Sequence, residues 1–315
     1  MIALITSILA ITVRAGTSLI YAAIGETYTE RSGILNLGVE GMMLMGAVTA
    51  FAVSFHTHNL VLALAVAVAV GALMAAVHAF LTVTMRANQV VSGLSLTILG
   101  TGLSSFLGQR LGPDGGPLVG LVGAKFDPIV IPGLSRIPVV QALFQQDILT
   151  YAVYLLVPLA WFVLYRTRLG LDLRATGENP QTADAMGVNV AATRYAYTIL
   201  GGALAGLGGA HLSLAYTPGW TENLTGGRGW IVIALVIFAM WNPARAVLGA
   251  LLFGGINAVQ FRLQAAGARI PAAFLNMLPY IATIAVLVVM TWWEALSKRV
   301  GAPAALGKAY MREEK

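Results

Sequence analysis

The chain has 315 residues, of which 58% are hydrophobic and only 10% are charged. Soluble domains carry about 25% charged residues, so the composition excludes a soluble globular protein and predicts an all-α polytopic membrane protein. The net charge of +6 does not indicate nucleic-acid binding, because the basic residues lie mainly between apolar segments, where they set membrane orientation. The absence of cysteine excludes disulfides, Cys-ligated zinc and thiol catalysis.

Apolar segments follow one another along the whole chain, which predicts a single transmembrane domain over residues 1–315. A helix needs about 20 apolar residues to cross a membrane, so we expect about 8–10 transmembrane helices, some of them broken or re-entrant. The segments are 2–24, 34–56, 60–83, 88–108, 147–165, 195–216, 230–241, 246–264 and 276–294.

Two of these segments depart from a simple span. Segment 230–241 is too short to cross alone, so we expect it to form a hairpin with segment 246–264 around "WNPAR". Segment 2–24 contains Arg14 and is expected to be broken or re-entrant, because a charge within a span is costly.

The basic residues predict the orientation. When the loop 166–194 is placed in the cytoplasm, most of the 19 basic residues fall on that side. The tail 295–315 is then cytoplasmic and the loop 109–146 is outside. The outer loop contains five prolines, which exclude one regular helix and predict short turns with a surface helix over the outer mouth.

The inner loop contains the signals of a short helix. Asn179 can cap it, Pro180 suits its first turn and Gly187 suits the position after its end. The body "QTADAM" is about two turns long and is too short to be stable alone. From these residues two interpretations are open: a surface helix that joins two spans, and a docking helix that transmits force from a soluble partner.

The chain carries no nucleotide-binding motif of its own. "GxxxxGK[ST]" does not occur, and Gly307–Lys308 is followed by Ala309. No His/Asp/Glu cluster has metal-ligand spacing, so a membrane enzyme has little support. If transport uses ATP, another chain must bind it.

The stretch "ERSGILNLGVEGMMLMGA", residues 30–47, places an amide and a carboxylate in a span. An ionisable residue within the membrane is a functional candidate by default, and Asn36 and Glu40 are spaced to share one helix face. Two roles are open for Glu40: helix capping or interhelix bonding, and a part in the pathway or its gate. Glu26 and Glu30 are expected to be solvated or paired with Arg31.

Further polar residues begin the fourth span. Gln89, Ser92 and Ser95 face a translocation pathway or form bonds across helices. His78 and His211 each lie alone on an apolar span, and a structural role is the expected one for both.

Three blocks carry a resemblance to a known family. They are the stretch at 30–47, "LRATGENPQTADAMGV" within 172–188, and "GGRGWIVIALVIFAMWNPARAVLGALLFG" at 226–254. The chain resembles the permease subunits of bacterial ABC importers in the branched-chain amino acid, ribose and nucleoside permease family. The spelling of the first block is similar to the nucleoside branch.

The resemblance implies a permease subunit that imports nucleosides or related small polar solutes through the cytoplasmic membrane; simple sugars, or an ion-coupled secondary transporter, are the alternatives. It implies four kinds of partner: a second homologous permease, a cytoplasmic ABC ATPase that binds ATP and magnesium, an extracytoplasmic substrate-binding protein or lipoprotein, and membrane lipid. No cofactor on this chain and no nucleic acid are expected. The implied ATPase-coupling residues are Gly177, Glu178, Asn179, Pro180, Ala183 and Gly187.

Overall fold

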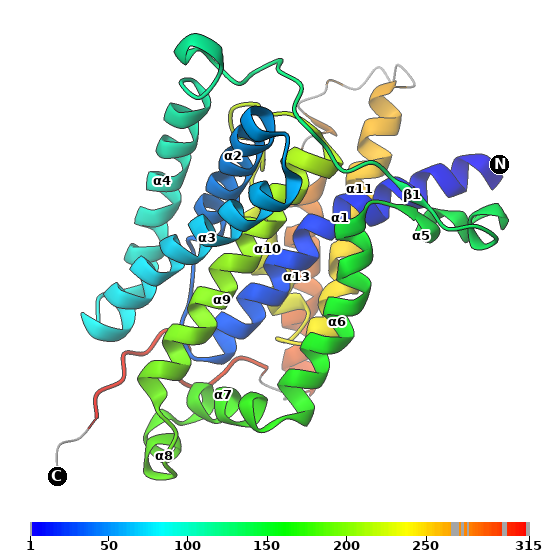
Figure 1. The fold of residues 1–315 in the computed structure, drawn as a ribbon. Helices are drawn as coiled ribbons and strands as arrows, with labels where there is room; N and C mark the ends of the chain where they lie inside the picture. Colours follow the sequence, from blue (N-terminus) through cyan, green and yellow to red (C-terminus); the bar gives the residue numbers. More distant parts are fainter. Residues whose placement is uncertain (1, 266–270, 272–273, 276, 298–300, 313–315) are drawn as a thin grey trace.

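The computed structural model describes residues 2–265, 271, 274–275, 277–297 and 301–312. They form the expected all-helical bundle (Figure 1). The long helices are α1 (Ile2–Arg31), α2 (Val39–Thr57), α3 (Leu60–Ala79), α4 (Gln89–Gly108), α6 (Ile148–Arg166), α9 (Val190–His211), α11 (Pro243–Ala265) and α13 (Leu278–Ser297). The short ones are α5 (Gln141–Phe144), α7 (Arg168–Glu178), α8 (Pro180–Ala185) and α10 (Arg228–Phe238).

Seven helices of the described part of the chain are long and apolar enough to cross a membrane: α1, α2, α3, α4, α6, α9 and α11. Helices α3 and α9 each end in a π-helical turn, η1 (Phe80–Thr84) and η4 (Leu212–Tyr216). Helix α13 adds a further apolar helix of 20 residues. Helix α10 has only 11 residues and is too short to cross alone.

Helices α1, α2 and α9 form the centre of the bundle. In the apolar 18-residue stretch of each of these helices, 67% to 78% is buried inside the bundle. The corresponding share is 28% to 39% for α3, α4, α6 and α11. The outer helices present large apolar side chains such as Val61, Ile98 and Leu155 to the surroundings, as expected for contact with lipid.

Small residues allow the central backbones to touch. A Cβ on Gly46 of α2 would overlap the backbone of Gly206 in α9, and a Cβ on Gly71 of α3 would overlap Gly202. Close approach of this kind is the usual basis of helix association in membranes, where lipid removes the hydrophobic driving force. The glycine-rich stretch 201–209 therefore positions α9 against both neighbours.

The first helix is continuous, so the expected break in segment 2–24 is wrong. Arg14 is accommodated because its Nε donates to Gln146 Oε1 at 2.9 Å and its NH2 donates to Gln145 O at 3.1 Å. The break comes later, in the connecting segment, residues 32–38, which joins α1 to α2 and is not helical.

The loop 109–146 forms short turns, as expected from its prolines. It contains η2 (Pro113–Gly115), β1 (Ile129–Val130), η3 (Leu134–Arg136), the four-residue α5 and β2 (Gln145–Gln146), with β1 antiparallel to β2. The expected hairpin of α10 and α11 is also present, and its turn places Met240 and Trp241 at positive φ.

The bundle has two distinct ends (Figure 1). Helices α7 and α8 and the C-terminal tail lie at one end, here called the α7–α8 end. The N-terminus, α5 and β1 lie toward the other. Helices α1 and α6 both finish at the α7–α8 end, so the basic residues Arg31 and Arg166 lie there together.

Candidate functional site

The first three N–H groups of the connecting segment, those of residues 32–34, still bond to carbonyl groups at the end of α1. Beyond them the connecting segment leaves the helix inside the bundle, so its backbone groups need other partners. Helices α3 and α4 supply them. Leu35 N donates to Gln89 Oε1 at 2.7 Å, and Leu35 O lies 3.1 Å from His78 Nε2. Leu37 O accepts from Thr97 Oγ1 at 2.7 Å.

Ser92 of α4 therefore bonds across helices to His78 of α3, whereas Gln89 binds the non-helical connecting segment. Ser92 Oγ lies 2.9 Å from His78 Nδ1, which orients the ring toward Leu35. His78 is fully buried and has the expected structural role. Ser95 is exposed and takes no part in this network.

Asn36 and Glu40 do not share a helix face, so that prediction is wrong. Asn36 precedes the first residue of α2, Val39. Its Oδ1 accepts from Gly38 N at 2.9 Å, two residues on, and its Nδ2 donates to Glu26 Oε2 at 3.2 Å. An asparagine that bonds its own backbone in this way favours a turn, and this turn ends the connecting segment before α2 starts.

Glu40 binds the start of another helix. Its Oε1 accepts from Thr225 Oγ1 at 2.5 Å and from Gly227 N at 2.9 Å, and its Oε2 accepts from Gly229 N at 2.5 Å. The side chain is 4% exposed. These contacts, here called the Glu40 clamp, satisfy N–H groups at the N-terminus of α10, which helices leave without partners and where a negative charge is favourable.

The clamp lies deep in the bundle. Helix α10 runs from it to the α7–α8 end, where the Trp241 indole donates to Glu30 and Arg31 NH2 donates to Met240 O at 3.3 Å. Eleven helical residues extend about 16 Å at 1.5 Å each, which is about half of a hydrocarbon core of about 30 Å. Two irregular backbone segments, one before α2 and one before α10, thus meet about one α10 length from the α7–α8 end. Broken helices that meet inside a bundle are found at transporter binding sites.

A cavity of about 290 Å³, lined by both polar and apolar side chains, adjoins the clamp. Its lining includes Thr225, Arg228, Asn257 and Tyr280. Tyr280 donates to Gly226 O at 2.8 Å, and the Arg228 guanidinium donates to Ala15 O at 3.2 Å and lies over the Tyr216 ring. Sequence reasoning missed this set, although the spacing of Asn257 and Gln260 would place both on one helix face.

Glu26 and Glu30 are neither solvated nor paired with Arg31, so that expectation is wrong. Each is 1% exposed. Glu26 accepts from Asn36 and Glu30 accepts from Trp241, so each carboxylate holds one irregular segment against α1. Arg31 lies 3.9 Å from Glu178 instead.

The predicted short helix exists as α8. Asn179 caps it by accepting from Thr182 N at 3.0 Å, Pro180 is in its first turn, and Gly187 follows it at φ +89°. Pro180 and Ala183 are buried against the bundle, whereas Asn179 and Gly187 are exposed.

Gly177 and Glu178 end the preceding helix α7, which sequence reasoning missed although Thr167 caps it by accepting from Gly170 N at 3.2 Å. Gly177 packs against Arg31 O, where a Cβ has no room. Sequence reasoning also missed Met186, a large apolar side chain that is 81% exposed at the tip of the loop.

Comparisons with known proteins agree with this architecture. A family described as "Branched-chain amino acid transport system / permease component" matches residues 7–290. A putative glucose ABC transporter permease of Haloferax volcanii is 44% identical, with 96% of each chain covered. A nucleoside ABC transporter permease of Lactococcus lactis is 36% identical, with 95% of this chain and 94% of the relative covered.

A guanosine ABC transporter permease of Bacillus subtilis is 33% identical, with 93% of each chain covered. No solved structure matches the chain. The family match spans most of the chain and these relatives align with nearly all of it. The chain therefore belongs to the family of branched-chain amino acid transport system permease components, and it is a multi-pass membrane transport subunit.

Proposed function

We propose that this subunit provides the translocation pathway for nucleosides or related small polar solutes in an ABC importer of the bacterial cytoplasmic membrane. Two relatives that align along nearly the whole chain are named as nucleoside and guanosine permeases. The observation that carries the proposal is the Glu40 clamp, where two irregular segments meet inside the bundle beside a cavity with polar side chains in its lining. A gate needs this combination of backbone that can move and polar groups that can meet a solute.

The proposed role of Glu40 is to hold the closed gate. Asn36, Gln89 and Ser92 keep the connecting segment in position for it. Ser95 is exposed on α4, where it would meet lipid or the second, homologous permease subunit.

The α7–α8 end is the proposed cytoplasmic face and the docking site of the ABC ATPase. Helix α8 has six residues and is held by its buried side, while Met186 projects from the tip. An exposed apolar side chain on a short, supported helix suits insertion into a groove of a partner. ATP and magnesium would be bound by the ATPase, and a substrate-binding protein or lipoprotein would deliver solute at the opposite end.

Simple sugars are the second candidate substrate class. The observation in their favour is the 44% identity to a protein named as a putative glucose permease. The polar side chains in the cavity lining, such as Asn257 and Arg228, suit the hydroxyl groups that sugars and nucleosides share.

The test is reconstitution of the subunit in proteoliposomes with its candidate ATPase, second permease and binding protein, taken from genes adjacent to its own. ATP-dependent uptake of labelled nucleoside that unlabelled glucose does not compete with is the expected result. Competition by glucose alone would assign the sugar class. Uptake driven by a proton gradient without ATP or partners would overturn the proposal in favour of a secondary transporter.

A further inference from the structure

The C-terminal tail, of which residues 301–312 are described, packs between α7–α8 and the end of α1. Ala305 N donates to Gly177 O at 2.8 Å, and Gly307 N donates to Gly33 O at 3.1 Å. Pro303 and Ala305 are buried. The tail thus joins the helix that precedes α8 to the turn that opens the connecting segment.

Arg194, in the first turns of α9, strengthens the same junction. Its Nε donates to Ser32 O at 3.2 Å and its NH1 donates to Lys308 O at 3.1 Å. The residue is 1% exposed, and none of the ion pairs among the described residues involves it. Burying a guanidinium is costly, and among the described residues these two carbonyl groups are hydrogen-bond partners that compensate for it.

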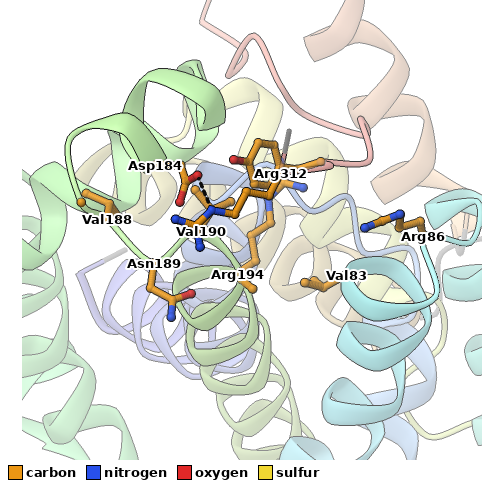
Figure 2. A pocket seen from close by; sticks show the side chains of 11 residues that line it. Val83, Arg86, Asp184, Val188, Asn189, Val190, Arg194 and Arg312 are labelled. Atoms are coloured by element: carbon orange, nitrogen blue, oxygen red, sulfur yellow. Dashed lines mark ion pairs between the residues drawn. The ribbon is translucent and has the colours of Figure 1, made fainter. Parts of the chain in front are cut away.

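A third contact ties the tail to α8 itself. Figure 2 shows Arg312 of the tail pointing at Asp184 of α8 across a surface pocket that Arg194 also lines. Arg312 Nε lies 3.1 Å from Asp184 Oδ2. The Arg312 side chain is 78% exposed, and exposed ion pairs contribute little, so the buried bonds of Arg194 and of the tail backbone carry the junction.

From these contacts we propose that Arg194 and the C-terminal tail transmit movement of the coupling helix α8 to the connecting segment, and through it to the Glu40 clamp. The tail and α7–α8 move as one body, and Arg194 and Gly307 join that body to the Ser32–Gly33 turn. Arg194 is a positioning residue, since it acts through backbone groups of the pathway. This inference rests on the proposed function, because it presumes that a partner moves α8.

The test compares Arg194→Lys with Arg110→Lys in the reconstituted transporter. Lysine keeps the charge but lacks the fork of donors needed to bind two carbonyl groups at once. Arg110 is an exposed arginine two residues after the end of α4 and serves as the matched control. In Arg194→Lys we expect ATPase activity that still responds to loaded binding protein, with solute imported per ATP lower by about fivefold or more. A chain ending at Ala302 should show the same loss.

A chemical cross-link tests the one-body claim independently. The chain contains no cysteine, so Asp184→Cys with Arg312→Cys gives a unique pair for a short bismaleimide. Cross-linking is expected to leave uptake per ATP unchanged. Arrest of uptake by the cross-link would overturn the proposal, because it would show that tail and α8 must separate.

The outcomes keep the two claims apart. If the wild-type assembly shows no ATP-dependent uptake, the proposed function fails. If the wild type transports and Arg194→Lys, inserted at the wild-type level, lowers ATPase activity and uptake in equal proportion or changes neither, only the role of Arg194 and the tail is overturned.

Discussion

Replacement of Glu40 by glutamine tests the clamp most directly. The carboxylate accepts from Thr225, Gly227 and Gly229, using both oxygens. The amide keeps one acceptor oxygen and places an NH2 group against a donor, so at least one of the N–H groups loses its acceptor. The N-terminus of α10 also loses its negative charge.

The magnitude follows from these two losses. A hydrogen bond to a charged group contributes about 1.5–3 kcal/mol, and a charge at a helix N-terminus contributes about 0.3–2 kcal/mol. Because the side chain is 4% exposed, water cannot replace the missing partner. We therefore expect Glu40→Gln to lower the free energy of unfolding by about 2–5 kcal/mol.

The assay is thermal unfolding of the detergent-purified subunit, read as the shift in midpoint relative to the wild type. Glu222→Gln is the control, because Glu222 lies in the loop that precedes α10, is exposed, and accepts a hydrogen bond from Ser105 Oγ at 2.6 Å. Its shift should correspond to less than about 1 kcal/mol. Equal midpoints for the two variants would refute the claim that the clamp holds α10 in place.

Three further predictions concern other parts of the chain. Met186→Asp should weaken ATPase binding in a pull-down while membrane insertion stays normal, and equal binding by this variant and the wild type would contradict docking at the tip. Ala183→Leu should instead lower thermal stability, because Ala183 is buried. Gly46→Val should prevent stable folding, seen as aggregation in size-exclusion chromatography, since its Cβ meets backbone. Ser92→Ala leaves a buried His78 nitrogen without its partner and should lower the free energy of unfolding by about 1–3 kcal/mol. Ser95→Ala, at an exposed position, should change it by less than about 0.5 kcal/mol; thermal unfolding measures both.

The sequence predicted the helices well because hydrophobic segments of about 20 residues have one structural solution in a membrane. It also predicted α8 correctly, because Asn179, Pro180 and Gly187 each act through local backbone geometry. Both successes depend on information that lies within a few residues.

The failures have a common physical cause. The Glu40 clamp joins residues 40 and 225–229, and the tail junction joins residues near 33, 177, 194 and 305. No local pattern encodes such distant contacts. The assumption that Asn36 and Glu40 share a helix also failed for this reason: the segment around Asn36 is not helical, and side chains of α3 and α4 satisfy its backbone groups.

The clamp explains why a chain with few charges keeps a carboxylate inside the bundle. An isolated charge at mid-membrane costs about 2.5–3.5 kcal/mol on insertion scales, and the exposed N–H groups of a half-helix are also costly there. In this fold each cost offsets the other, because Glu40 accepts from the donors at the start of α10. The carboxylate and the break before α10 therefore depend on each other, and movement that separates them must expose both to water or solute. If the clamp acts as the proposed gate, this requirement would couple its opening to hydration of the cavity beside it.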